Sequence, residues 1–184
     1  RTGLADLATT LSAFGDFVAS VMLNEARLVR SAEEMSRMAV LTDGEETIDR
    51  TNWSTTVVSY YQFGGAIALA LDLSLRERSG GRVTLDDYMR ALWRVHGRPG
   101  GRRPGYVDRP YTMADAEARL AEVSEDANFA RDFFGRFIQG HDVADYVRLL
   151  RQAGLVLRAP RASEPWIGEV EMSTGSRGVR IESA

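Results

Sequence analysis

The most apolar segment of the chain, residues 57–75, constrains the fold more than any other feature. Its longest uninterrupted apolar run covers residues 63–71, well short of the roughly 20 residues that a membrane-spanning helix needs. An apolar segment of this length that is not a membrane span is typical of a helix buried in a protein core. Gly80-Gly81 follow it, as expected where a helix ends. The sequence therefore predicts one long buried helix.

Apolar spacings and capping motifs predict further helices on both sides of this segment. A capping box at Ser31–Glu34 opens one of them, and Thr84 and Thr112 are the expected N-caps of two others. The other predicted helices cover about residues 4–25, 127–138 and 143–153. After residue 154 the pattern favours short strands at 155–157, 167–170 and 179–181. We therefore expect a mainly α fold, with a helical body over residues 1–154 and a short β-rich tail over 155–184.

Composition excludes several classes of function. The net charge is −3, which argues against a general nucleic-acid or anionic-membrane footprint, so we expect neither partner. Cysteine is absent, which removes thiolate zinc sites and cysteine nucleophiles. All 23 basic residues are Arg, so the chain has no lysine for Schiff-base chemistry or for a Walker-type phosphate site.

The histidines do not have the spacing of a metal site. His96 and His141 lie 45 positions apart, and only His141 has a carboxylate, Asp145, four residues further on. No HExxH motif is present, so the chain by itself predicts no zinc site. We interpret His96 as a side chain at a helix C-terminus and His141 as a loop residue.

The charged residues allow both structural and functional interpretations. Capping explains Asp86-Asp87 at a helix start, and Asp72 in the apolar helix is expected to face water or an arginine; the alternative is a buried functional carboxylate. The arginines near residue 100 could hold an anion, but the Gly and Pro content there favours a solvated loop. These arginines are Arg94, Arg98, Arg102, Arg103 and Arg109.

The aromatic residues are also ambiguous. Four phenylalanines at helical spacing within residues 129–137 predict core packing, and Trp53 could line a cleft. Tyr60 and Tyr61 stand shortly before Gly64-Gly65. A tyrosine at a cleft can donate a hydrogen bond to an oxyanion, although core packing is the usual role of such residues.

Six segments in a fixed order resemble motifs of peptidase family M61, the glycyl aminopeptidases. Members of that family typically carry a TTVSYYxKG helix, ALxLDLxLR, SLDDVMRxLW, YT-x-x-D, DFFxRYxxG and LLxxAGL, and then a PDZ domain that often opens with PWLG. The match is specific as a set over about residues 55–168 and weak over residues 1–54. The matching segments here are TTVVSYYQFGGAIALALDLSLR (55–76), TLDDYMRALW (84–93), YTMAD (111–115), DFFGRFIQG (132–140), LLRQAGL (149–155) and PWIG (165–168).

The resemblance implies a zinc metallopeptidase that removes N-terminal Gly or Ala from peptides. The helical body would be the C-terminal half of a thermolysin-like (gluzincin) catalytic domain, and residues 155–184 would be the linker and first strands of a truncated PDZ domain. The family's zinc ligands would lie upstream, so zinc belongs to the parent protein and we expect none to be bound by this fragment, which would be inactive alone. The implied partners are the peptide substrate and the rest of the chain's own catalytic domain.

One catalytic role falls within the matching region. By resemblance, Tyr61 occupies the place of the tyrosine that stabilises the oxyanion in related gluzincin aminopeptidases, with Tyr60 as the second choice. Phe63 stands where the family usually has Lys, which puts the substrate or the activity in doubt. The alternative is a non-catalytic helical and PDZ peptide-binding or scaffold protein, an inactive homologue of the peptidase.

Overall fold

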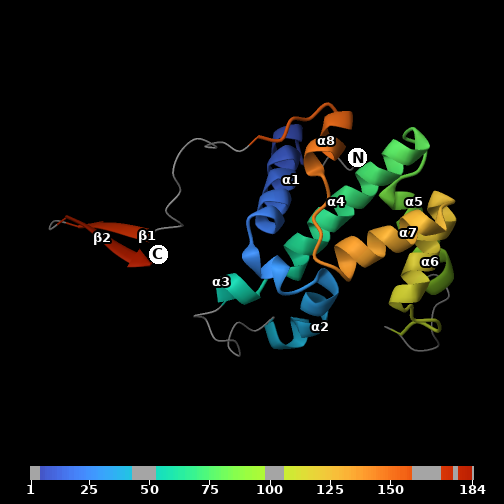
Figure 1. The fold of residues 1–184 in the computed structure, drawn as a ribbon, viewed down its shortest axis with the longest axis horizontal. Coiled ribbons are helices and arrows are strands. Elements are labelled where there is room, and N and C mark those ends of the chain that lie inside the picture. The colour runs from blue at the N-terminus through green and yellow to red at the C-terminus, as the bar shows by residue number, and fades with distance from the viewer. Residues whose placement is uncertain (1–4, 43–52, 98–105, 159–170, 176–177, 184) are drawn as a thin grey trace.

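The computed structural model describes residues 5–42, 53–97, 106–158, 171–175 and 178–183. The fold is mainly α, as the sequence predicts. A long helix, α4 (Tyr60–Ser79), runs through the helical body, and α1 (Leu7–Met22), α2 (Ala32–Thr42), α5 (Leu85–Leu92), α6 (Met113–Ser124) and α8 (Tyr146–Gln152) all contact it (Figure 1). The core therefore forms around the segment that is most apolar in sequence.

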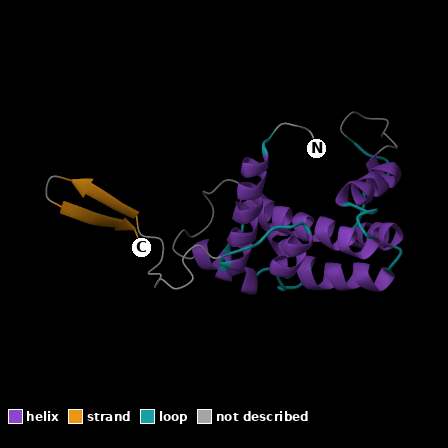
Figure 2. Cartoon of the chain, turned by 90° about the horizontal axis from the view of Figure 1, so that it is seen from above, coloured by secondary structure: helices purple, strands orange, loops and turns teal. Residues whose placement is uncertain are grey.

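Shorter elements complete the body. The 3-10 turn η1 (Glu25–Leu28) contacts the single-turn helix α3 (Trp53–Thr56). Two helices end in π-helical turns, α5 in η3 (Trp93–Gly97) and α7 (Ala127–Phe133) in η4 (Phe134–Ile138). Figure 2 shows the helices of the body from above, and α6 and α7 pack against each other.

The predicted capping motifs are confirmed. Each of three capping boxes consists of a hydroxyl residue and a carboxylate residue three positions later. The hydroxyl accepts a hydrogen bond from the backbone N–H of the carboxylate residue, and the carboxylate accepts one from the backbone N–H of the hydroxyl residue. Their contacts include Ser31 N to Glu34 Oε2 at 2.8 Å and Thr112 N to Asp115 Oδ2 at 2.9 Å. The boxes are Ser31/Glu34, Thr84/Asp87 and Thr112/Asp115.

The long helix begins later than the sequence predicts. Val57 and Val58 are buried but lie in a non-helical segment, and Ser59 is the N-cap of α4. Two adjacent β-branched residues favour extended backbone, while their burial gives the same apolar pattern as a helix would. At the other end Gly80 adopts a left-handed conformation with φ 63°, which confirms the predicted glycine stop.

The tail differs from its prediction in one strand. Leu155–Leu157 is not a strand: Leu155 and Leu157 pack against the helical core while Val156 is exposed. This alternation of buried and exposed side chains gives the same sequence pattern as a strand, although the segment does not form one. The described strands are β1 (Glu171–Gly175) and β2 (Gly178–Ser183), which pair antiparallel, so only the prediction at 179–181 is confirmed. The prediction at 167–170 lies outside the described residues.

Candidate functional site

Tyr61, the predicted catalytic residue, lies in the first turn of α4 and presents its side chain to solvent. The side chain is 70% exposed, and its ring centroid lies 4.3 Å from that of Tyr60. By contrast, the tyrosines Tyr88 and Tyr146 are buried. Burial raises the pKa of the Tyr88 phenol to about 12, and its hydroxyl donates to the Ala116 carbonyl at 3.2 Å. Tyr61 thus has the accessibility that a hydrogen-bond donor to a substrate needs.

The residues that follow Tyr61 face different surroundings. Phe63 is only 2% exposed and belongs to the hydrophobic core. A Cβ added at Gly65 would come within 3.0 Å of the Phe17 ring on α1, so the missing side chain allows the two helices to pack closely there. Gly64 has open space at the same point.

The two histidines bind backbone rather than a common ligand. His96 is buried in η3, its Nδ1 lies 3.0 Å from the Arg109 carbonyl oxygen, and its ring meets Tyr111 edge-on. The His96 side chain therefore connects the end of α5 to the segment before α6, and does not bond to the carbonyl groups of its own helix. His141 is an exposed loop residue, as predicted, with Nδ1 2.9 Å from the Arg27 carbonyl oxygen.

Among the described residues, no group of three or more His, Asp or Glu side chains is placed to hold a metal ion. The described side chains therefore do not by themselves provide the ligand set of a zinc ion. Nor is any helix of the described part long and apolar enough to cross a membrane.

Asp72 pairs with an arginine, as predicted, and also joins two helices. Its Oδ2 accepts from Arg76 Nε at 2.7 Å, and its Oδ1 accepts from the Leu85 backbone N–H at 2.9 Å. The carboxylate thus ties α4 to the first turn of α5, and its role is structural. Asp86 and Asp87 lie in that same turn, where Asp87 completes the capping box.

The arginine-rich stretch is only partly described. Arg94 donates to the Arg90 carbonyl of the preceding turn at 3.3 Å, and both Arg94 and Arg109 are exposed. Arg98, Arg102 and Arg103 lie outside the described residues, so the choice between a solvated loop and an anion site stays a prediction. The side chain of Trp53 also lies outside the described part.

The phenylalanine row is core, as predicted. Phe133 and Phe134 are buried, and Phe129 and Phe137 pack against the core from its edge. The Phe133 ring centroid lies 5.8 Å from that of Phe129 and 5.0 Å from that of Phe137.

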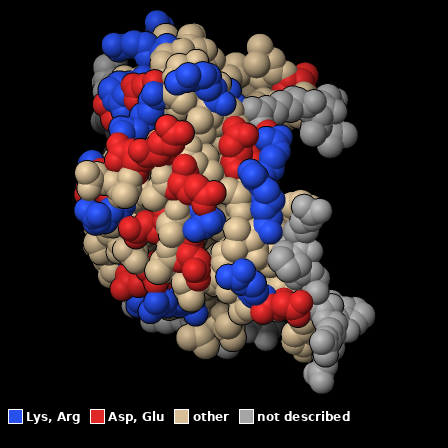
Figure 3. All heavy atoms as spheres, turned by 90° about the vertical axis from the view of Figure 1, so that its right-hand side faces the viewer, with Lys and Arg blue, Asp and Glu red and all other residues tan. Residues whose placement is uncertain are grey.

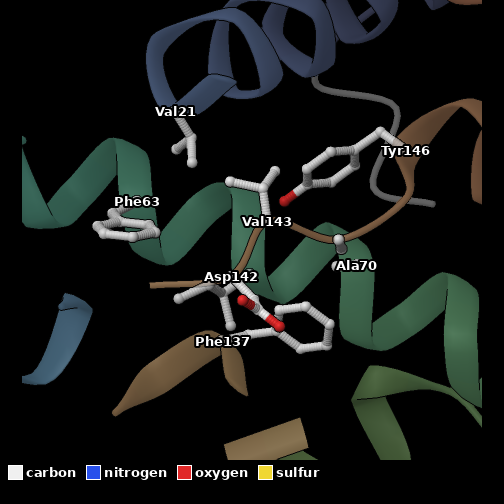
Figure 4. Close-up of a pocket in the computed structure, with 9 residues that line it drawn as sticks. Val21, Phe63, Ala70, Phe137, Asp142, Val143 and Tyr146 are labelled. Atoms are coloured by element: carbon white, nitrogen blue, oxygen red, sulfur yellow. The ribbon is translucent and has the colours of Figure 1, made fainter. Parts of the chain in front are cut away.

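A small cavity lies between α1, α4 and the segment before α8 (Figure 4). Figure 4 shows apolar side chains of Val21, Phe63 and Val143 around it, and its volume is about 10 Å³. That is at the lower limit for one water molecule, so it is a packing defect rather than a ligand site. A larger hollow of about 280 Å³ lies at the C-terminal end of α4, beside Arg78, Ser79, Arg82 and Glu125.

The charged residues visible in Figure 3 mix both signs on that face. Arg78 near the end of α4 pairs with Asp126, the N-cap of α7, and Arg119 pairs with Glu122 on α6 at 2.5 Å. The described residues of this face therefore form no extended patch of a single charge.

Sequence reasoning missed two arginines, Arg27 in η1 and Arg30 just after it. The Nε atoms of both are buried and have no hydrogen-bond partner among the described residues. No local motif marks them, and the one printed side-chain hydrogen bond of Arg27 goes to the His141 carbonyl, more than a hundred residues away.

Comparisons of the chain with protein-family models, with curated proteins and with solved structures give no significant match.

Proposed function

We propose that the chain is the C-terminal part of a zinc aminopeptidase catalytic domain of the glycyl aminopeptidase type, followed by the beginning of a PDZ domain. The observation that carries the proposal is the accessible phenol of Tyr61 on the first turn of α4, within the segment whose motifs resemble that family. Helical architecture around this segment supports the proposal without being specific to it.

The local chemistry suits stabilisation of an oxyanion. When a peptide bond is attacked, the carbonyl oxygen gains negative charge, and a phenol O–H placed beside it donates a hydrogen bond that strengthens in the transition state. Tyr61 also lies at the positive, N-terminal end of a long helix dipole, where Ser59 makes no side-chain capping bond. Both features favour negative charge near this end of α4.

The remaining machinery belongs, in this proposal, to the part of the parent protein outside this chain. When bound there, zinc would polarise the scissile carbonyl and activate a water molecule. Exposed apolar residues near the start of α4 are suited to contact the rest of the catalytic domain. They include Met22, Leu23, Leu28 and Val29. They are linked to this end of the molecule by Asn24, whose amide donates to the Val57 carbonyl at 3.4 Å.

A Tyr61→Phe substitution in the parent protein tests the proposed role. We expect kcat for release of N-terminal Gly or Ala to fall roughly 10²–10³-fold, the usual loss for one oxyanion donor, with a small change in KM. Tyr106→Phe is the matched control because Tyr106 is equally exposed, at 70%, and lies outside the matching motifs. An unchanged kcat in Tyr61→Phe would remove Tyr61 from the reaction; a loss in Tyr60→Phe instead would assign the donor to Tyr60.

The burial of Phe63 favours a second candidate, a peptide-binding or scaffold protein derived from the peptidase. At 2% exposure, the side chain at the family's lysine position is part of the core and offers no charge to a substrate. This candidate predicts that the parent binds peptides without cleaving them. Peptide binding measured by calorimetry, with no product released in the same sample, would favour it over the enzyme.

A further inference from the structure

Gly64 lies on the same face of α4 as Tyr61, about one turn further along the helix. Residues three apart in an α-helix are neighbours on its surface, with about 5–6 Å between their Cβ positions. Both residues are exposed. A Cβ built at Gly64 would meet nothing within 4 Å, so no atom of the Tyr61 ring reaches this position. The surface next to Tyr61 is therefore open at Gly64.

The Tyr61 ring contacts Tyr60 instead. The two ring centroids lie 4.3 Å apart, with the planes tilted by 34°. Helical side chains lean toward the N-terminus of their own helix. A side chain at position 64 would thus lean toward Tyr61 and cover the surface beside it. The glycine keeps that surface uncovered.

The described structure contains no packing or backbone reason for a glycine at position 64. Gly65 is explained by Phe17, whose ring would meet an added Cβ at 3.0 Å, but Gly64 has no such neighbour. Its backbone is helical and does not have the positive φ that favours glycine at Gly80. Glycine inside a helix lowers stability relative to alanine, and one use of such a glycine is the close approach of a ligand to the backbone.

We propose that the peptide backbone crosses α4 at Gly64, which makes Gly64 a specificity-determining residue beside Tyr61. A scissile carbonyl that accepts the hydrogen bond of Tyr61 lies within about 3 Å of the phenol oxygen. An extended peptide advances about 3.3 Å per residue, so the residues that flank this bond reach the surface over Gly64. The inference rests on the proposed function for the class of ligand, a peptide, and does not require that the peptide is cleaved.

Larger side chains at position 64 of the parent protein test this role. With a peptide that begins with Gly, the readout is KM if the N-terminal residue is released, and Kd from calorimetry if it is not. We expect Gly64→Leu to raise that constant at least about tenfold and Gly64→Ala less than about threefold, with kcat changing less than KM. Gly64→Gln should match Gly64→Leu, because the obstruction is steric.

The outcomes separate this inference from the proposed function. Weaker peptide binding in Gly64→Leu without any release would refute the peptidase and support the role of Gly64. Release with the same KM in Gly64→Leu, Gly64→Gln and the wild type would support the peptidase and overturn the role of Gly64. A parent that binds no such peptide would overturn both.

Gly15→Leu is the matched control. Gly15 also lies inside a helix, α1, and a Cβ built there would meet nothing within 4 Å. Leucine is a better helix former than glycine at both positions, and thermal unfolding of each variant checks that the fold is kept. Peptide affinity should be unchanged in Gly15→Leu. An equal loss of affinity in Gly15→Leu and Gly64→Leu would overturn the assignment.

Discussion

At the scale of single residues, the two adjacent glycines of α4 have opposite surroundings. The Cβ of an alanine at Gly65 would meet three atoms of the Phe17 ring at 3.0–3.1 Å, whereas at Gly64 it would meet nothing within 4 Å. Gly65 therefore allows α1 to pack closely on α4. Gly64 lowers the stability of the helix and makes no close packing contact among the described residues.

This difference predicts opposite outcomes for two similar substitutions. Gly64→Ala should raise the free energy of unfolding by about 0.5–1 kcal/mol through helix propensity. Gly65→Ala should lose that gain to the clash with Phe17 and be at least about 1 kcal/mol less stable than Gly64→Ala. Urea unfolding of both variants measures the difference, and equal stabilities would contradict the packing role of Gly65.

Asp72 carries a second prediction at this scale. Asp72→Ala should lower the free energy of unfolding by about 1–3 kcal/mol, because it leaves Arg76 and the half-buried Leu85 N–H without their acceptor. Asp132→Ala is the matched control, since its pair with Arg136 is exposed and 3.5 Å long, and it should cost less than about 0.5 kcal/mol. A similar cost in both variants would show that Asp72 does not join the two helices.

At the scale of elements, the helix starts depend on ionised carboxylates. Hydrogen bonds from Thr112 lower the pKa of Asp115, and those from Thr84 lower the pKa of Asp87. A carboxyl group whose pKa is lower in the folded state stabilises the fold above its unfolded pKa, near 4. That contribution is lost as the pH falls through the folded pKa.

The fold should therefore lose stability as the pH drops below about 4. Asp115→Asn should flatten this dependence, because the asparagine has no proton to gain in that range. Thermal unfolding at a series of pH values measures the slope for both proteins. An identical slope in the variant would mean that this cap does not contribute to acid sensitivity.

The three capping boxes at Ser31, Thr84 and Thr112 were predictable from sequence because each is complete within four residues. The start of α4 has no such motif and was predicted wrongly: Val57 and Val58 are buried by tertiary packing and so gave the pattern of a helix that in fact begins at Tyr60. The alternation at 155–157 was misleading for the same reason. Tyr61 could be proposed from its motif, whereas no local motif marks the buried, unpartnered Nε atoms of Arg27 and Arg30.

At the scale of the whole molecule, the long apolar helix organises the body, and the chemistry is proposed at its N-terminal end. The phenol of Tyr61 is accessible there, and apolar side chains such as Leu23 and Leu28 are exposed nearby along the chain. In the proposed enzyme, this end meets the half of the catalytic domain that holds the metal, so this chain contributes one hydrogen-bond donor to a shared site.

The most direct test of this account is a peptidase assay of the parent protein with peptides that begin with Gly or Ala. The account predicts release of the N-terminal residue, loss of that activity on chelation, and recovery when zinc is restored. Absence of release from a folded, zinc-loaded parent would contradict it.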